Sequence, residues 1–189
     1  MFATIDSIIK RDPAARSRWQ VILTYPGYQA VWMHRITHWL WQRRHYMLAD
    51  LLSHWTRHHT GVEIHPAAQI GQRLFIDHGM GVVIGATAIV GDDVIMLHGV
   101  TLGARHDHPG KRHPTIGNNV LLGANALILG AIIIHDYAKV GAGAVVLHDV
   151  LAGNTVAGNP AQVVRSWQRH HLITHLEQQT NKKEGSIHD

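Results

Sequence analysis

The stretch "VLLGANALILGAIIIHDYAKVGAGAVV", from Val120 to Val146, decides the fold because its apolar residues recur with a fixed period. An aliphatic residue stands at every sixth position, and a small or apolar residue follows four positions after each. A six-residue period matches neither the 3.6-residue repeat of a helix nor the two-residue alternation of a strand. It is typical of a parallel β-helix, in which each short strand forms one side of a coil.

The same period covers most of the chain. The predicted inward aliphatic residues are Ile64, Ile70, Ile76, Ile84, Val90, Met96, Leu102, Ile116, Leu122, Ile128, Ile134, Val140 and Val146. The small or apolar residues four positions later are Ala68, Leu74, Ala88, Val94, Val100, Val120, Ala126, Ile132, Ala138, Ala144 and Val150. Sixteen of the eighteen glycines lie in this region, where they suit tight corners. We therefore expect residues 61–165 to form one β-helix domain.

The register is interrupted twice, and both interruptions carry titratable residues. Ile84 follows Ile76 by eight positions instead of six, and this gap contains Asp77 and His78. An extra loop, "GARHDHPGKRHPT", separates Leu102 from Ile116 and contains Arg112 and His113. Insertions in a repeat protein disturb the core little and often form its binding face. We therefore expect the two interruptions to be neighbours in space.

Residues 1–60 follow a different pattern. Five of the six tryptophans lie there, in segments with helical spacing such as "YQAVWMHRITHWLWQRR". The spacing predicts a region of two to four short helices. Asp12 before Pro13 predicts a helix that starts at Pro13 with Asp12 as its cap. Residues 166–189 read as a short basic helix followed by a polar tail that is poorly ordered from about residue 177.

Composition excludes several classes of protein. The absence of cysteine rules out disulfides, zinc–thiolate sites and a cysteine acyl-enzyme, and it fits a cytoplasmic protein. The net charge of +4, with only 16% charged residues and no long Lys/Arg run, favours a small anionic ligand over nucleic acid. No window holds eighteen uninterrupted apolar residues, so we expect neither a membrane span nor a signal peptide.

The interruptions suggest acid–base chemistry. A histidine such as His78 is the usual general base near neutral pH, and it works best beside a carboxylate that fixes its tautomer. Glu63 lies fifteen residues earlier, close to one coil, and is the candidate carboxylate. Structural readings stay open at this point: His78 as a packing histidine, Asp77 as a turn former and Glu63 as a strand-edge carboxylate. Arg112 and His113 also fit a solvated loop. The "HDH" at 106–108 lacks a closed ligand set, so no metal site is predicted.

Several motifs together resemble those of the serine O-acetyltransferases. They are "GVEIHPAAQIG" (61–71), "FIDHGMGVVIG" (75–85), "GKRHPTIG" (110–117) and "AGNPAQVV" (157–164), preceded by "IIKRDPAARSRW" (8–19). The likeness covers roughly residues 4–165. The DHGMG and KRHP elements at this separation distinguish the serine branch from other hexapeptide-repeat acyltransferases.

The resemblance implies a left-handed parallel β-helix that forms a homotrimer, with active sites between neighbouring subunits. The reaction would transfer acetyl from acetyl-CoA to L-serine for cysteine biosynthesis, with acetyl-CoA as co-substrate and no permanently bound cofactor or metal. The implied catalytic residues are His78 as base and Glu63 as its orienting carboxylate. The implied serine-binding residues are Asp12, Asp77, Arg112 and His113. The implied acetyl-CoA-binding residues are Gly103, Ala104, Ala124, Lys139 and Ala142.

The sequence also departs from the family pattern. Ala104 stands where a glycine is expected, and the loop that follows is bulkier and richer in histidine, which leaves the acceptor open. Relatives that dock onto cysteine synthase do so with a C-terminal isoleucine, whereas Ile187 is followed by two residues, so that partner is not expected. Pairing of trimers through the helices is left open.

Two alternatives to serine acetylation remain. An enzyme of the same fold could acetylate another small acceptor, such as homoserine or a sugar. The fold also serves non-catalytic scaffolds and gamma-type carbonic anhydrases, which need a three-histidine zinc site across subunits.

Overall fold

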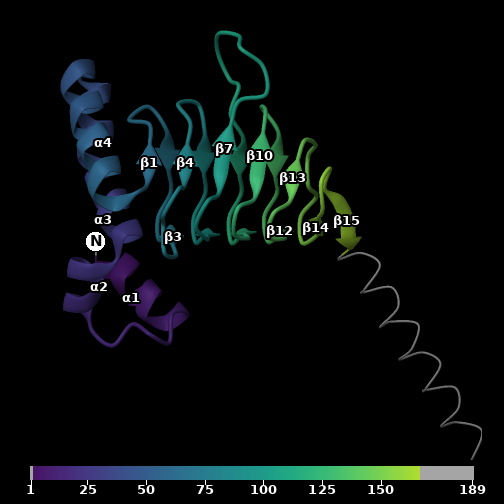
Figure 1. Cartoon of the computed structure of the whole chain (residues 1–189), viewed down its shortest axis with the longest axis horizontal. Coiled ribbons are helices and arrows are strands. Elements are labelled where there is room, and N and C mark those ends of the chain that lie inside the picture. The colour runs from purple at the N-terminus through teal and green to yellow at the C-terminus, as the bar shows by residue number, and fades with distance from the viewer. Residues whose placement is uncertain (1, 167–189) are drawn as a thin grey trace, which may run out of the picture.

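In the described part of the chain, residues 2–166, four helices come first and a left-handed parallel β-helix follows (Figure 1). In this computed structural model the helices are α1 (Phe2–Arg11), α2 (Arg18–Thr24), α3 (Pro26–Gln42) and α4 (Tyr46–Thr60). The prediction of two to four short helices before residue 60 is confirmed. The helix and tail expected near the chain end, with Ile187, concern residues 167–189, which lie outside the described range.

The β-helix has three walls, and each wall is a sheet built mainly of parallel strands. Sheet A contains β1 (Glu63–Ile64), β4 (Val83–Ile84), β7 (Thr101–Gly103), β10 (Leu127–Leu129) and β13 (Val145–Val146). Sheet B contains β2 (Gln69–Ile70), β5 (Ile89–Val90), β8 (Thr115–Ile116) and β11 (Ile133–Ile134). Sheet C contains β3 (Phe75–Ile76), β6 (Ile95–Met96), β9 (Leu121–Leu122), β12 (Lys139–Val140), β14 (Thr155–Ala157) and the antiparallel β15 (Gln162–Arg165). The chain visits A, B and C in turn, so the sheets enclose a triangular prism.

One turn of the coil takes eighteen residues where nothing is inserted. Val83 pairs with Thr101, eighteen residues further on. The turn before it is longer, because Glu63 pairs with Val83, twenty residues on. The turn after it is longer again, because Thr101 pairs with Leu127, twenty-six residues on. Both interruptions of the six-residue period are therefore taken up at corners, and the strands stay in register.

The inward side chains form one column along the prism. Every aliphatic residue predicted to face inward is at most 8% exposed. The residues four positions later are buried as well, apart from Ile132, which packs on the same core while partly exposed. Burying this unbroken aliphatic column is the main favourable term for such a fold. The predicted parallel β-helix is confirmed.

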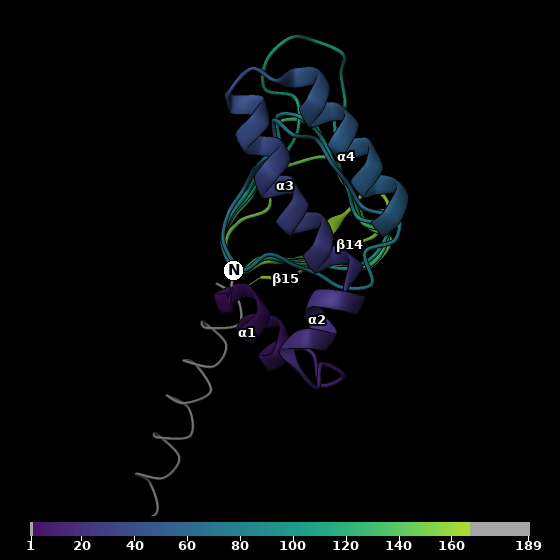
Figure 2. The same ribbon diagram turned by 90° about the vertical axis from the view of Figure 1, so that its left-hand side faces the viewer.

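The helical region covers the open N-terminal end of the β-helix. Carbonyl groups of each later coil accept hydrogen bonds from amides of the coil before it, as the carbonyl of Ala88 does from Gln69 (3.0 Å). The first coil has no preceding coil, so side chains of α3 and α4 act as the donors. These bonds run from Ser53 to Ile64 O (2.8 Å), His38 to Pro66 O (2.7 Å), His34 to Ala68 O (3.2 Å) and Arg35 to Ile70 O (2.7 Å). Figure 2 shows α3 lying across the end of the coil.

The expectation that Asp12 caps a helix starting at Pro13 is wrong. Asp12 follows the last residue of α1, and its amide donates to the carbonyl of Ile8 (2.8 Å). Its carboxylate accepts from the amide of Ala14 (2.8 Å), which makes a local turn instead of a helix start. The next helix begins only at Arg18, where Ser17 provides the cap. Asp12 is thereby left with one carboxylate oxygen free for a tertiary contact.

Candidate active site

Two edges of the prism carry most of the predicted site residues. The C/A edge consists of the corners that join sheet C to sheet A, residues 77–82, 97–100, 123–126 and 141–144. The A/B edge consists of the corners that join sheet A to sheet B, residues 65–68, 85–88, 104–114 and 130–132. The long corner 104–114 is the teal loop that rises from the top of the prism in Figure 1.

Asp77 and His78 lie in the first corner of the C/A edge, which is two residues longer than the later corners of the same edge. His78 adopts a left-handed backbone conformation (φ 59°), and Gly79 follows with φ 76°. A Cβ at Gly79 would stand 2.8 Å from Val62, so only glycine fits this tight path. The side chain of His78 is 76% exposed, and its Nε2 lies 3.9 Å from Asp77 Oδ1. The corner thus presents an open imidazole beside a carboxylate.

Asp12 and Asp77 both face Tyr25, although they come from distant segments. The phenol of Tyr25 donates a 2.6 Å hydrogen bond to Asp12 Oδ2. Burial, this hydrogen bond and the negative charges of Asp12 and Asp77 raise the pKa of Tyr25 to about 12. Two carboxylates close to one phenol give this part of the surface a negative potential that suits an ammonium group.

Glu63 opens β1, directly after the C/A edge. Its carboxylate accepts a 2.8 Å ion pair from Arg57 of α4, and both side chains are roughly half exposed. His78 has its described contacts elsewhere, with Asp77 and, ring to ring at 6.1 Å, with His98 one coil on. The structure therefore places Glu63 beside the corner of His78 without a hydrogen bond between them.

Arg112 and His113 end the long corner of the A/B edge. The guanidinium of Arg112 contacts the fully exposed Asp107 at 3.2 Å. His113 is only 7% exposed, and its ring lies over Gly85, where a Cβ would stand 2.0 Å from Cδ2. Burial, followed by the charges of Arg112, Lys111 and His65, lowers the pKa of His113, so the ring stays neutral. This edge presents a guanidinium next to a neutral imidazole.

Four of the five predicted acetyl-CoA residues lie along these two edges, and the fifth, Lys139, lies on sheet C. Gly103 ends β7 and Ala104 is exposed at the start of the long corner, both on the A/B side. Ala124 and Ala142 occupy equivalent corners of the C/A edge on successive coils, linked by a 2.8 Å hydrogen bond from the Gly143 amide to the Ala124 carbonyl. Lys139 is exposed at the start of β12, on sheet C.

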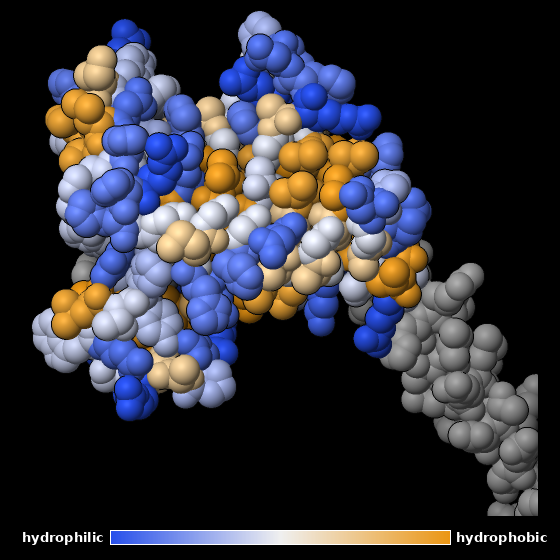
Figure 3. All heavy atoms as spheres, in the orientation of Figure 1, coloured by the Kyte–Doolittle hydropathy of each residue, from blue (hydrophilic) through white to orange (hydrophobic). Residues whose placement is uncertain are grey.

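Within one chain the two motif pairs are apart. Asp77 and His78 lie on one edge and Arg112 and His113 on the other, with sheet A between them. The expectation that the two interruptions are neighbours is wrong for a single chain, because the first follows a strand of sheet C and the second a strand of sheet A. The outward residues of sheet A after β1 are Val83, Thr101, Gly103, Leu127, Leu129 and Val145. Figure 3 shows apolar side chains gathered on this face.

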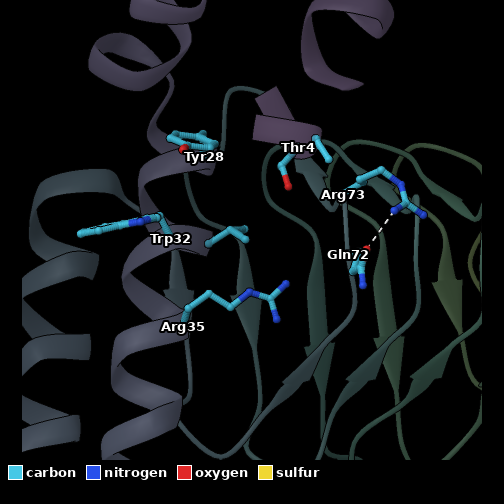
Figure 4. A pocket seen from close by; sticks show the side chains of 8 residues that line it. Thr4, Tyr28, Trp32, Arg35, Gln72 and Arg73 are labelled. Carbon is cyan, nitrogen blue, oxygen red and sulfur yellow. Dashed lines mark hydrogen bonds between the residues drawn. The ribbon is translucent and has the colours of Figure 1, made fainter. Parts of the chain in front are cut away.

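Two cavities of the described chain lie away from these edges. One, of about 360 Å³, is bordered by Tyr28, Trp32 and Arg35 of α3 and by Gln72 and Arg73 (Figure 4). The other, of about 440 Å³, lies between α3 and α4. Arg35 already donates to the carbonyls of Ile70 and Gly71, so its charge is committed to the fold. A smaller cavity, of about 160 Å³, is bordered by Arg57, Glu63 and His65, so one predicted site residue, Glu63, lines a cavity within a single chain.

Among residues 2–166, no three His, Cys, Asp or Glu side chains gather so that they could hold a metal ion. None of the helices within this range is both long enough and apolar enough to cross a membrane.

Comparison with known proteins gives the family. The serine acetyltransferase of Helicobacter pylori is 52% identical over 161 residues, which are 85% of this chain and 94% of that protein. The serine acetyltransferase of Synechococcus elongatus is 54% identical over 168 residues, 87% of this chain and 69% of that protein. The chain belongs to the serine acetyltransferase family. A model of the bacterial transferase hexapeptide (six repeats) also matches residues 113–148.

Solved serine acetyltransferases share the fold. The Brucella abortus enzyme in complex with coenzyme A superposes with a TM-score of 0.83 at 42% identity, over 85% of this chain and 64% of that one. The soybean enzyme complexed with serine gives 0.83 at 46% identity, over 86% of this chain and 67% of that one. The chain thus spans about two thirds of these solved serine acetyltransferases.

Three further residues belong to the candidate site and were not predicted from the sequence. Tyr25 binds Asp12, Gly85 makes room for His113, and Thr87 hydrogen-bonds His113. The contact of Thr87 with His113 could have been predicted from the register of the coils. Ile89 pairs with Thr115, and Thr87 and His113 each stand two residues before one of these partners, so they occupy equivalent positions on successive coils. No such register predicts the contact of Tyr25 with Asp12, because it depends on how α1 and α2 pack.

Proposed function

We propose that this chain is a serine O-acetyltransferase, which transfers acetyl from acetyl-CoA to the hydroxyl of L-serine and supplies O-acetyl-L-serine for cysteine biosynthesis. The observation that carries the proposal is the placement of two motif pairs on the two edges that border one apolar sheet. One edge offers cations for a carboxylate, and the other offers carboxylates for an ammonium group and a histidine base. A cytoplasmic location stays part of this proposal.

Each active site is proposed to form between two copies of the chain in a homotrimer. In a closed threefold ring with sheet A toward the axis, the A/B edge of one copy meets the C/A edge of the next. The apolar outward residues of sheet A support this arrangement, because such a face is stabilised when a neighbour covers it. Trp32, Trp39 and Trp55 are 44–50% exposed on α3 and α4, which supports further pairing of trimers through the helices.

Serine is proposed to be held at both ends. Arg112 offers a planar fork to the carboxylate, and His113 adds a second donor beside it. Asp77 and Asp12 of the neighbouring copy face the ammonium group. This division leaves the serine hydroxyl near His78, on the same corner as Asp77.

The reaction is proposed as direct attack in a ternary complex. His78 accepts the hydroxyl proton while the serine oxygen bonds to the thioester carbon. The tetrahedral intermediate then collapses with cleavage of the carbon–sulfur bond, and the leaving thiolate of CoA takes a proton from the imidazolium. A thioester is already activated, so no covalent enzyme intermediate is required.

Glu63 is proposed to orient His78. Its present partner Arg57 is half exposed, and such ion pairs are worth only about 0–1 kcal/mol. A turn of the carboxylate from Arg57 toward His78 is therefore inexpensive once the neighbouring copy closes the site. Proximity in the fold supports the assignment, since the Gly81 amide donates to the Gly61 carbonyl (2.9 Å) next to β1.

Acetyl-CoA is proposed as a co-substrate that runs along the edges. Gly103, Ala104, Ala124 and Ala142 carry little or no side chain, so the pantetheine arm can approach their backbone. Lys139 is exposed and offers a cation to the CoA phosphates.

The test is a thiol-release assay with acetyl-CoA and L-serine, with the product identified by its mass. We expect O-acetylserine and a clear preference for serine over homoserine and over a sugar acceptor. Preferred acetylation of either alternative would change the acceptor, and no transfer to any of them would overturn the proposal.

A further inference from the structure

Thr87 makes four hydrogen bonds to the Arg112–His113 pair. Its Oγ1 accepts from the backbone amide of Arg112 (3.0 Å) and from that of His113 (3.1 Å). Its own amide lies 3.2 Å from His113 Nδ1, and its Oγ1 lies 2.8 Å from the same nitrogen. One side chain on the preceding coil therefore holds both the backbone and the ring of the motif.

These bonds fix the position of the imidazole proton. A backbone amide can only donate, so Nδ1 of His113 must accept from the amide of Thr87. The hydroxyl of Thr87 already accepts from two amides, so its own proton is directed to Nδ1 as well. A neutral imidazole whose Nδ1 accepts carries its proton on Nε2.

The surroundings keep the ring of His113 neutral and fix its orientation. The cations that face it are Arg112 and Lys111 on its own loop. His65 on the first coil also faces it, and burial lowers the pKa of His65. A third cation beside Arg112 and Lys111 would be unfavourable. Lys111 is itself anchored to the carbonyls of Thr87 (2.7 Å) and Pro114 (3.2 Å), which ties the loop end to the corner of Thr87. Nε2 has no acceptor among the described residues and lies over the space left by Gly85.

We propose that Thr87 is a positioning residue that holds His113 as a neutral Nε2–H donor to the carboxylate of the amino-acid acceptor. This rests on the proposed function for the identity of the acceptor. His113 then acts as a hydrogen-bond donor and not as a second base, because its Nδ1 lone pair is already used by two donors.

The first test reads the tautomer without any reaction. In uniformly ¹⁵N-labelled protein, long-range proton–nitrogen correlation spectra distinguish the two ring nitrogens, and the signal of His113 is assigned by its loss in His113→Gln. We expect a neutral ring with the proton on Nε2. A proton on Nδ1, or a charged ring at pH 7.5, would overturn the proposal even if the enzyme acetylates serine.

The second test uses a matched set of variants. Thr87→Val keeps the shape but removes the hydroxyl, so we expect the serine KM to rise roughly tenfold while the acetyl-CoA KM changes less than about twofold. Thr87→Ser should restore the wild-type serine KM. Thr115→Val, on the next strand, removes a hydroxyl with no described hydrogen bond and should have no effect.

The outcomes separate the two proposals. Equal rises in both KM values, or no rescue by serine, would overturn the role of Thr87. If Thr87→Val does not fold, the comparison of Thr87→Ser with wild type and the tautomer of wild-type His113 still decide it. Absence of acetyl transfer by the wild-type protein would refute the proposed function alone, because the tautomer is measured independently.

Discussion

The phenol of Tyr25 donates a 2.6 Å hydrogen bond to Asp12, and the charge of Asp77 acts on the same phenol. Tyr25 lies between α2 and α3, Asp12 follows α1 and Asp77 follows β3, so three segments converge there. With a pKa of about 12 the phenol stays protonated in any ordinary assay and remains a donor. Tyr25 thus restrains one of the two carboxylates that we assign to the serine ammonium group.

Replacing Tyr25 with Phe should therefore weaken serine binding. We expect the serine KM to rise by roughly tenfold with little change in the acetyl-CoA KM, since one hydrogen bond to a charged group is lost. Tyr28→Phe is the matched control, because that buried hydroxyl has no hydrogen-bond partner among residues 2–166 and its removal should leave both constants unchanged. Steady-state kinetics of the two variants, with thermal unfolding to verify folding, make the comparison. A normal serine KM in Tyr25→Phe would remove Asp12 from the serine site.

Replacing His78 with Asn should lower kcat by about two to four orders of magnitude, because general-base catalysis usually accelerates a reaction by that factor. The dissociation constant of CoA, measured by calorimetry, should stay near the wild-type value. His98→Asn is the control, since His98 lies one coil further along the same edge with its ring 6.1 Å from that of His78. Near-normal turnover of His78→Asn would assign the base elsewhere.

Mixed trimers should recover activity that neither parent has. His78→Asn damages the C/A edge and Arg112→Ala damages the A/B edge, so each homotrimer should be inactive. In trimers formed from equal amounts of both chains, about a quarter of the shared sites combine two intact edges in a closed ring. Refolding the two variants together should restore roughly that share of wild-type kcat. Mixtures that stay as inactive as the parents would place the whole site in one chain.

Glu63→Gln and Asp77→Asn should separate orientation from binding. Glu63→Gln should lower kcat with little change in the serine KM, because His78 loses the carboxylate proposed to orient it. Asp77→Asn should chiefly raise the serine KM. Arg57→Gln, which releases Glu63 from its ion pair, serves as the control and should keep the wild-type kcat and KM. The opposite pattern in the two carboxylate variants would exchange their roles.

His34 should make the fold sensitive to acid. Burial, followed by the charges of His38 and Arg35, lowers the pKa of His34 to about 3 from an ordinary value of 6.5. Between these two pKa values the unfolded chain binds a proton at His34 that the folded chain does not. The stabilisation gained by burying a neutral His34 is therefore complete above pH 6.5 and decreases as the pH falls. The contribution of His34 to the free energy of unfolding then changes by up to about 1.4 kcal/mol per pH unit.

Urea unfolding at fixed protein concentration from pH 7 to pH 4 measures this effect. His34→Gln keeps a donor for the Ala68 carbonyl and should flatten the pH dependence by about that slope. His148→Gln, at an exposed corner, should leave the slope unchanged. An equal slope in His34→Gln and wild type would contradict the prediction.

The sequence by itself determined the β-helix, because its core follows a local rule. One inward aliphatic per six residues, as at Ile128, Ile134 and Val140, gives each strand its buried face whatever its neighbours are. The two breaks in that period also located Asp77–His78 and Arg112–His113, since an insertion in a packed coil must leave the wall. The resemblance to serine acetyltransferases then assigned roles to these residues.

Only the tertiary structure decided where those residues point. Periodicity does not say which corner of the coil an insertion occupies, and the two motif pairs fall on different edges with sheet A between them. The cap predicted at Asp12 was wrong because the chain there makes a turn, which leaves its carboxylate to Tyr25. The contacts of Tyr25 with Asp12 and of Arg57 with Glu63 depend on side-chain directions and on packing between segments, and no spacing along the chain encodes these. The contact of Thr87 with His113 differs, because the register of the coils places the two residues at equivalent positions.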